Sequence, residues 1–587
     1  MSVSTRPPDW LRRYGNLQGY SWRPTTLNRS SAFCRPLGLV EFSFDTDGRH
    51  YEGRADMNVC IKTELVTTLS KADLRERILL AWTRLRSQHL LLRATTIRDE
   101  SDSLAPQGLH FAVSIPESWQ HARIEAEKQI VWLEDHYENV DWKDFYHHCQ
   151  NVKRIIDPNV ALAKVFVLPT ENEDGKRIQR FQFVGGHQIW DGLSSYVWMR
   201  DFVHCLNETS SNLQDQLTTY IQPESIRQRL PLPQEALYPP IPGNVARQRW
   251  FWVITRILRH VRTPLPAGFE NPLRRQDGVK KQAVRFEQKY AAVLDYSSVP
   301  PLDTTTLHVA IPSSSAQHLS ALCRSTSTTL GAGIFALAAL TMMEAHEASS
   351  SSSSSSSHNT ENPFITGFPL NPRAFFNHHT DPNSMMLAFS DGISLPSLPS
   401  SLPFSSRLRL LTRLAHRQLT SYQKRARPTG DAAKRQNLTS RGAGLVLANQ
   451  YLYSLERCAA VLPTGHGAFE GGSVQGAYPA RPNPTTQTCG VSSVGRRDAI
   501  IGKGMYDVES LAQQRGKDLV VDSRDMTASV RAREGEFLVG IGGAEGGLFA
   551  AVSIDGSVMD DEKVEAWKRR FETCLEELGR DGGLARL

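Results

Sequence analysis

The sequence predicts a mixed α/β protein built from two related globular halves. The chain has 587 residues, more than the roughly 250–300 that a single core usually organises. Segments with the periodicities of strands and helices follow one another in a similar order in both halves. A polar, proline-rich stretch separates the halves, as a linker would.

The first half, residues 1–206, mixes strands and helices. Residues 39–44 are apolar enough to predict a strand. Residues 71–91 predict a helix because their large apolar side chains fall on one face, and Ser70 with Asp73 makes a suitable N-terminal cap. Three more strands are expected at residues 110–115, 164–168 and 179–184.

Residues 207–290 are predicted to form a linker and a crossing helix. The linker part contains LPLPQEALYPPIPGN, and proline disfavours both helix interiors and central strands. A basic aromatic stretch, residues 247–262, follows. It fits a helix lying on a membrane surface. The preferred interpretation is a linker helix whose apolar face packs on the protein's own core and whose arginines face water.

The second half, residues 291–587, restarts a globular pattern. A strand is expected at residues 307–311, a helix from Ser314 and an apolar helix at 329–347. Nine consecutive serines, Ser349–Ser357, follow, and we expect a mobile surface loop there because serine buries no apolar area. The later elements are expected at residues 364–376 (strand and loop), 536–540 and 547–554 (strands), and from a cap at Asp560 or Asp561 to 578 (helix).

Composition and termini bear on partners and location. The net charge of +6 is small for this length, so a nucleic-acid partner is not expected. No run of about 18 apolar residues and no secretory signal is present, so neither a transmembrane segment nor secretion is expected. We expect a cytoplasmic monomer. The ending Ala585-Arg586-Leu587 resembles a peroxisomal signal and keeps that location as an alternative.

The cysteines and histidines do not predict a metal site. The eight cysteines include no C-x-x-C pair, which fits free thiols in a reducing compartment. His147, His148 and Cys149 are adjacent, but neighbouring side chains point in different directions and rarely chelate one ion. The same holds for His378 and His379.

The stretch FQFVGGHQIWDGLSS carries the predicted chemistry. His187, Asp191 and Gly192 form an H-x-x-x-D-G motif between an expected strand and an expected helix. An imidazole with a pKa near 6.5 is a suitable base for an attacking hydroxyl. Asp191 is expected to fix the local loop, and Gly192 to let the chain turn sharply.

This motif and its context resemble the H-x-x-x-D-G acyltransferase superfamily, which includes condensation domains and plant BAHD enzymes. The chain looks most similar to fungal O-acetyltransferases of the trichothecene 15-O-acetyltransferase type. The resemblance extends to SQHLLLRATT at residues 87–96, GFPLNPRAFF at 367–376 and LFAAVSIDGSVMDDEKVEAW at 548–567.

The resemblance implies two chloramphenicol-acetyltransferase-like subdomains, each a mixed sheet with helices, and a tunnel between them with His187 midway along it. It implies direct acyl transfer from acyl-CoA, in the first place acetyl-CoA, to a secondary-metabolite hydroxyl, with no tightly bound cofactor. Asp191 would pair with an arginine, for which Arg93 and Arg373 are the two candidates.

Departures from the family limit the prediction. No D-F-G-W-G follows near the C-terminus, which disfavours a BAHD enzyme, and Gly186 stands where condensation domains have a second histidine. No serine-hydrolase, dinucleotide-binding or P-loop motif appears. Three alternatives stay open: an amine acceptor, a carrier-protein thioester as donor, and a non-catalytic binding protein of the same fold.

Overall fold

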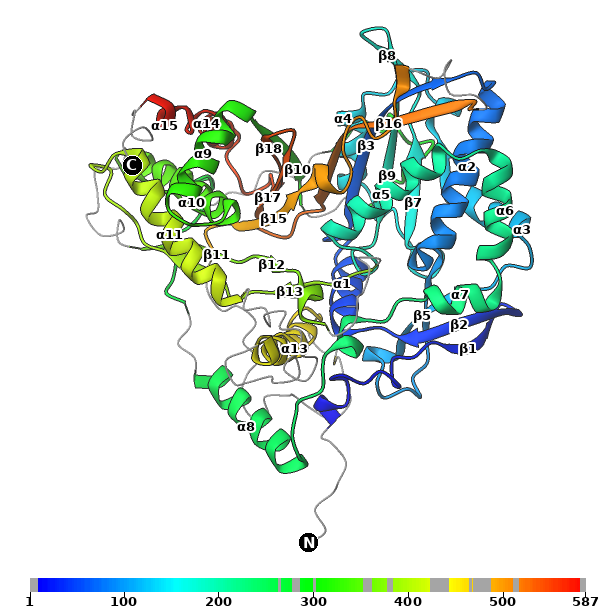
Figure 1. Ribbon diagram of the computed structural model, residues 1–587, viewed down its shortest axis with the longest axis horizontal. Helices are drawn as coiled ribbons and strands as arrows, with labels where there is room; N and C mark the ends of the chain where they lie inside the picture. The colour runs from blue at the N-terminus through cyan, green and yellow to red at the C-terminus, as the bar shows by residue number, and fades with distance from the viewer. Residues whose placement is uncertain are drawn as a thin grey trace.

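The computed structural model describes residues 9–261, 265–276, 285–298, 302–351, 362–376, 384–422, 443–463, 467, 487–509 and 517–580. Two lobes lie side by side, and helix α1 (Leu39–His50) lies between them (Figure 1). The histidine pair at 378–379, which was not expected to bind a metal, and the C-terminal residues 585–587 lie outside the described residues.

The main sheet of the first lobe has the strand order β16-β3-β9-β7-β6, with β8 paired to β9. Its strands are β3 (Met57–Thr67), β6 (Ile130–Trp132), β7 (Ala163–Val167), β8 (Glu171–Glu173), β9 (Lys176–Gly185) and β16 (Leu519–Val530). The edge strand β16 comes from near the C-terminus and pairs antiparallel with the whole of β3 (Figure 1). Thus the C-terminal part of the chain completes the sheet from which the motif follows.

A second sheet and six helices complete the first lobe. The sheet has the order β1-β2-β5-β4, with strands β1 (Arg23–Leu27), β2 (Ser30–Pro36), β4 (Thr95–Arg98) and β5 (Leu109–Ser114). The helices are α2 (Lys71–Gln88), α3 (Trp119–Glu127), α4 (Trp142–Asn151), α5 (Gly192–Leu206), α6 (Ser210–Tyr220) and α7 (Pro223–Arg229). As predicted, Ser70 caps α2 by accepting a hydrogen bond from the Asp73 amide.

The second lobe is built on a sheet of order β10-β18-β17-β15. Its strands are β10 (Thr304–Ile311), β15 (Gly490–Arg496), β17 (Phe537–Ala544) and β18 (Gly547–Asp555). Its helices are α9 (Ser313–Ser325), α10 (Leu330–Ser351), α11 (Phe404–Tyr422), α14 (Asp561–Thr573) and α15 (Glu576–Arg580). Short strands form two further pairs: β11 (Phe364–Thr366) with β14 (Ile393–Leu395), and β12 (Pro369–Leu370) with β13 (Ala388–Phe389).

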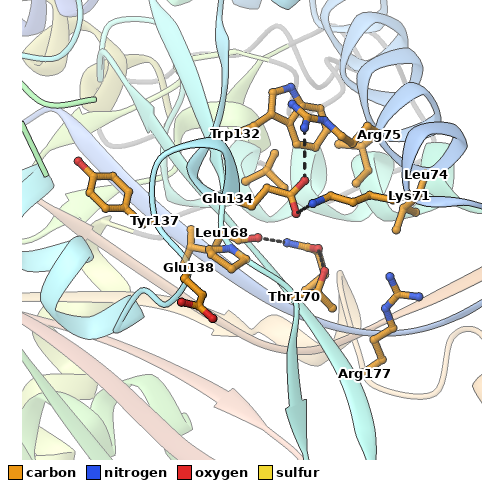
Figure 2. Close-up of a pocket in the computed structure, with 14 residues that line it drawn as sticks. Lys71, Leu74, Arg75, Trp132, Glu134, Tyr137, Glu138, Leu168, Thr170 and Arg177 are labelled. Atoms are coloured by element: carbon orange, nitrogen blue, oxygen red, sulfur yellow. Dashed lines mark hydrogen bonds and ion pairs between the residues drawn. The ribbon is translucent and has the colours of Figure 1, made fainter. Parts of the chain in front are cut away.

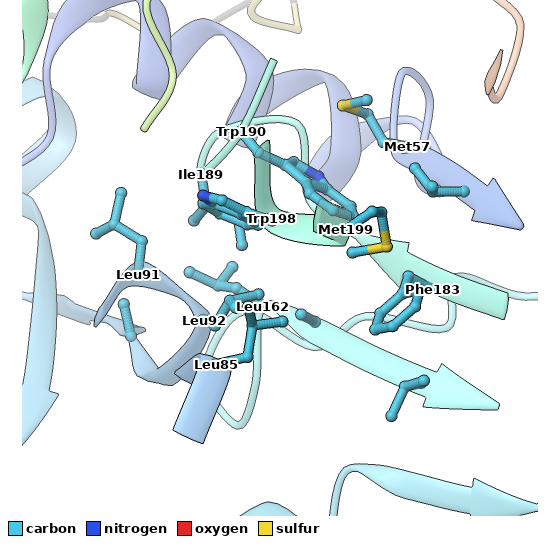
Figure 3. Close-up of a cluster of buried hydrophobic side chains, with 14 of the residues drawn as sticks. Met57, Leu85, Leu91, Leu92, Leu162, Phe183, Ile189, Trp190, Trp198 and Met199 are labelled. Carbon is cyan, nitrogen blue, oxygen red and sulfur yellow. The ribbon is translucent and has the colours of Figure 1, made fainter. Parts of the chain in front are cut away.

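Two further helices lie below the junction of the lobes, α8 (Val245–Val261) and α13 (Ala443–Ala460) (Figure 1). Each lobe has its own hydrophobic core. In the first, Trp190 and Trp198 stack at 5.1 Å between ring centroids beneath the motif (Figure 3). The described part of the chain has no single helix long and apolar enough to cross a membrane; α9 and α10 meet that criterion only as a pair bent by 113°.

Three local predictions were wrong. Residues 39–44 form the start of α1 instead of a strand, because the carboxylate of Glu41 accepts a hydrogen bond from the Gly38 amide and closes the first turn. The linker contains the regular helices α6 and α7, and Pro223 is tolerated because it opens α7. The loop prediction for the serine tract is wrong for its first three residues, because α10 runs to Ser351; the rest of the tract lies outside the described residues.

The predicted boundaries at 206/207 and 290/291 remain predictions. Strand β16 belongs to the segment 291–587 by sequence and to the first-lobe sheet by pairing.

Candidate active site

His187 lies in the turn that joins β9 to α5, as the motif predicted. The turn is held by two backbone hydrogen bonds, from the Gly186 amide to the Leu162 carbonyl (3.0 Å) and from the Ile189 amide to the Gly186 carbonyl (3.1 Å). The imidazole is 8% exposed, and the Phe44 ring of α1 stacks on it at 4.0 Å between centroids and 15° between planes. A rigid strand and a helix therefore fix the position of this side chain.

Burial makes the His187 imidazole neutral at physiological pH. Loss of water lowers its pKa from 6.5 to about 4, and the positive charge of Arg533 acts in the same direction. Asp191 and nearby backbone carbonyls oppose this shift without overcoming it. The ring Nδ1 is buried and has no hydrogen-bond partner among the described residues. The ring is therefore a free base in the pH range of the cell.

Asp191 is occupied by structural contacts. Its Oδ1 accepts hydrogen bonds from the Ser194 amide (2.9 Å) and hydroxyl (3.1 Å), so it caps α5. Its Oδ2 accepts from the Arg373 guanidinium (2.7 Å) and from the Met386 amide (2.9 Å). One carboxylate thus fixes the motif helix and ties it to Arg373 and Met386 of the second lobe.

Of the two arginines proposed as partners of Asp191, the structure places Arg373 there. It lies in a short 3-10 helix, Pro372–Phe375, and also donates to the Ser384 carbonyl at 2.8 Å. Arg93 lies elsewhere in the first lobe. Its guanidinium donates to the Ser114 carbonyl at 3.0 Å and is 3.7 Å from the Glu125 carboxylate.

Gly192 of the motif and Gly186 just before it both lie in close packing contacts. Gly192 has no left-handed φ, so the sharp turn expected of it is not its role. A Cβ on Gly192 would approach Cγ1 of Val494, in β15 of the second lobe, to 3.2 Å. A Cβ on Gly186 would lie 2.2 Å from the side-chain oxygen of Gln188, which is fully buried. Both glycines therefore allow close approaches that a side chain would block.

Helix α1 brings further residues to the site that the sequence did not reveal. Val40, Phe44, Ala55 and Met385 form a small core between the lobes, with Leu387 and Phe389 packed against it. The buried carboxylate of Asp47 pairs with Arg457 and Arg533 of the second half, each at 3.1 Å, and with Arg54. Although burial raises the pKa of Asp47, these guanidinium groups hold it below its usual value.

The sequence alone could not predict these contacts. Asp47 and Arg533 are 486 positions apart, and no local pattern relates them. Only the fold brings them together beside His187.

The adjacent histidines at positions 147 and 148 have separate partners. His148 Nδ1 lies 2.6 Å from the Tyr296 hydroxyl, and His147 Nε2 lies 3.6 Å from Asp303. Over the described ranges, no group of three or more His, Cys, Asp or Glu side chains is arranged to hold a metal ion.

His187 lines neither of two pockets found among the described residues. The first, of about 390 Å³, lies on the first lobe; Lys71 and Arg75 reach toward Glu134 along its wall, beside Trp132 (Figure 2). The second, of about 300 Å³, lies between α10 and α14 in the second lobe. The expected tunnel to His187 therefore stays a prediction.

Comparison with known proteins shows the fold. No protein-family model and no curated protein sequence matches the chain. Trichothecene 15-O-acetyltransferase from Fusarium sporotrichioides matches with a TM-score of 0.63 and 12% identity over 98% of this chain and all of that one. A four-domain nonribosomal peptide synthetase, bound to AMP and glycine, matches with a TM-score of 0.50 and 14% identity over 96% of this chain and 33% of that one. The α/β fold with two chloramphenicol-acetyltransferase-like lobes is thereby confirmed.

Proposed function

We propose that this protein is an acyltransferase that moves an acyl group from acyl-CoA to a hydroxyl of a small molecule, with His187 as the general base. The observation that carries the proposal is a buried, neutral imidazole at the strand-to-helix turn where the two lobes meet. The likeness in fold to an O-acetyltransferase supports an acetyl donor and a secondary-metabolite acceptor.

The reaction needs one base and no covalent enzyme intermediate. The acceptor hydroxyl loses its proton to the His187 imidazole while its oxygen bonds to the thioester carbonyl carbon. The carbon–sulfur bond then breaks, and the proton passes from His187 to the departing thiolate. At pH 7 the imidazole is in the neutral form that can accept the hydroxyl proton, and its low pKa makes it a weaker base than a free imidazole.

Asp191 acts as a positioning residue in this scheme. Both of its oxygens are engaged by Ser194, Arg373 and Met386. It fixes the start of α5 and thereby the turn that carries His187. Its effect on catalysis passes through geometry.

Gly186 bears on the alternative of condensation chemistry with an amine acceptor or a carrier-bound donor. A side chain at this position would collide with Gln188, whose amide lies 3.3 Å from Asp45 in the buried region. A second histidine before His187 therefore does not fit without moving Gln188. This favours a stand-alone transferase that uses a single histidine.

The test is release of free CoA from acetyl-CoA in the presence of a panel of hydroxylated terpenoids and polyketides. We expect His187→Ala to lower acceptor-dependent release by at least about 100-fold, the usual contribution of a general base. His204→Ala is the matched control, because His204 lies on α5 with its side chain 64% exposed. Unchanged turnover in folded His187→Ala protein would refute the mechanism.

Carrier-bound thioesters and amine acceptors form the second arm of the test. Release only from a carrier-bound thioester, or only with amines, would favour the condensation-like alternative. Folded protein that is inactive with every donor and acceptor would favour a binding protein of this fold.

A further inference from the structure

We propose that helix α8 docks the protein on a membrane surface that contains anionic phospholipids. The proposal concerns the outer face of α8, defined by Trp250, Val253, Ile254, Ile257, Leu258 and Val261. These six side chains are between 37% and 66% exposed. The helix lies at the lower extremity of the molecule, away from the main sheets of the two lobes (Figure 1).

The outer face is a continuous apolar stripe. Its members follow one another at spacings of three, one, three, one and three residues, which places them on one side of an α-helix. Amphipathic helices of soluble proteins usually turn such a stripe toward their own core. Here the stripe faces outward, so the preferred interpretation of this segment from its sequence was wrong.

The inward face of α8 explains why the helix keeps this orientation. Trp252, Thr255 and Arg259 are the buried residues of the helix. The Arg259 guanidinium makes two hydrogen bonds, of 2.7 and 2.6 Å, to the buried carboxylate of Glu456 on α13. Trp252 packs edge-on against Tyr14 at 4.9 Å between centroids. Rotating the helix to bury the stripe would leave the Glu456 charge buried without its partner, which is costly.

Charge identifies the surface that complements this face. The segment 245–261 contains no aspartate or glutamate; one of its four arginines, Arg259, is buried in the ion pair with Glu456 and does not contribute to the charge of the outer face. Arg247 is exposed near the N-terminal end of the helix. Arginine next to an apolar stripe with tryptophan is the composition of helices that lie in the headgroup region of anionic bilayers.

The shape of the face favours a lipid surface over a protein partner. The stripe runs along one helix of 17 residues, whereas a stable protein interface takes about 800 Å² from each partner. A bilayer deforms around a narrow ridge and accepts its full length. With 17 residues, the helix is about 25 Å long and lies flat along the surface in this arrangement.

The test is co-sedimentation of the full chain with vesicles of phosphatidylcholine alone or with one-third phosphatidylserine. We expect binding to the phosphatidylserine vesicles that weakens with added salt, and much weaker binding to the neutral ones. The double variant Ile257→Glu/Leu258→Glu should bind at least about tenfold more weakly, because two charges would enter the apolar layer.

A matched control separates this face from general surface hydrophobicity. Ile124 and Val160 lie on the first lobe and are 51% and 68% exposed, close to or above the values for Ile257 and Leu258. The variant Ile124→Glu/Val160→Glu should bind vesicles like the wild type. Circular dichroism and the melting temperature verify that both double variants are folded.

Three outcomes would overturn the proposal: no binding of the wild type to phosphatidylserine vesicles, equal binding to both vesicle types, or unchanged binding by the α8 variant. Concentration-dependent self-association that the α8 variant abolishes, with no vesicle binding, would make this face an interface between copies of the chain. None of these measurements depends on acyl transfer, so they test the helix independently of the proposed function.

Discussion

Breaking the ion pair between Asp191 and Arg373 tests how the lobes hold the motif. The two side chains are 5% and 10% exposed, and Nη2 of Arg373 lies 2.7 Å from Oδ2 of Asp191. Removing one partner of a buried pair typically costs about 3–5 kcal/mol. In Arg373→Met the Asp191 carboxylate keeps the hydrogen bonds that it accepts from the Ser194 and Met386 amides. We therefore expect a loss of about 2–4 kcal/mol in the free energy of unfolding.

Asp191→Asn should cost a similar amount, because the side-chain amide nitrogen would replace Oδ2 and meet two donors, the Arg373 guanidinium and the Met386 amide. Asparagine is as good an N-terminal cap as aspartate, so the start of α5 is preserved. The Arg373 guanidinium loses its charged partner and keeps the Ser384 and Met386 carbonyls. The expected loss is about 2–4 kcal/mol. If the two side chains act as a pair, the double variant will be less destabilised than the sum of the singles by about 1–3 kcal/mol.

The measurement is a double-mutant cycle in which urea unfolding is monitored by tryptophan fluorescence. A chain with two lobes need not unfold in one step, so the first transition is the quantity to compare. Arg496→Met is the control, because Arg496 pairs with Asp498 at the surface with its own side chain 75% exposed; we expect no measurable shift. A coupling energy of zero between Asp191 and Arg373 would refute the inference that this ion pair stabilises the contact between the lobes.

Two further predictions concern the ionisation of His187. Because the pKa of His187 is about 4, the activity (kcat/KM) of the wild type should persist below pH 6 and fall near pH 4. Phe44→Ala admits water to the imidazole and should move this fall toward pH 6.5. Phe44→Leu keeps more of the apolar cover and should move the fall less. The imidazole binds a proton near pH 6.5 in the unfolded chain and near pH 4 in the folded protein. The free energy of unfolding is therefore unaffected by His187 above pH 6.5 and decreases by roughly 3 kcal/mol as the pH falls to 4. Unfolding of His187→Gln should therefore depend less on pH over this range than unfolding of the wild type, and identical pH slopes would contradict the assignment.

Features encoded by neighbouring residues could be predicted from the sequence. The Ser70 cap, the periodicity of α2 and the turn carrying His187 each depend on side chains within a few positions of one another. The hairpin of β17 and β18 is equally local, since two residues connect the strands. In these places propensity and tertiary structure agree, and the prediction held.

Residues 39–44 show where local reasoning fails. A segment of six residues with four apolar side chains is too short to distinguish a buried strand from a buried helix. The choice is made by Glu41, which accepts from the Gly38 amide and from both terminal nitrogens of Arg35, each at 2.7 Å. The Arg35 guanidinium comes from β2 and is fully buried. The helix is thus selected by a tertiary ion pair that sequence periodicity does not contain.

The direction of an amphipathic face is likewise a tertiary property. The periodicity of α8 defines an apolar side and leaves open what that side contacts. The ion pair between Arg259 and Glu456 holds the opposite side of α8 against α13. The apolar stripe is therefore exposed.

The choice of Arg373 over Arg93 also depends on long-range packing. Both are arginines in segments that resemble the family, and both are largely buried. Arg93 is held within the first lobe by the Ser114 carbonyl, whereas Arg373 reaches Asp191 across the junction. Because Asp191 also caps α5, a contact made by the second lobe fixes the turn of the first. The proposed base therefore depends for its position on both lobes, and loosening their junction should alter its burial and, with it, its pKa.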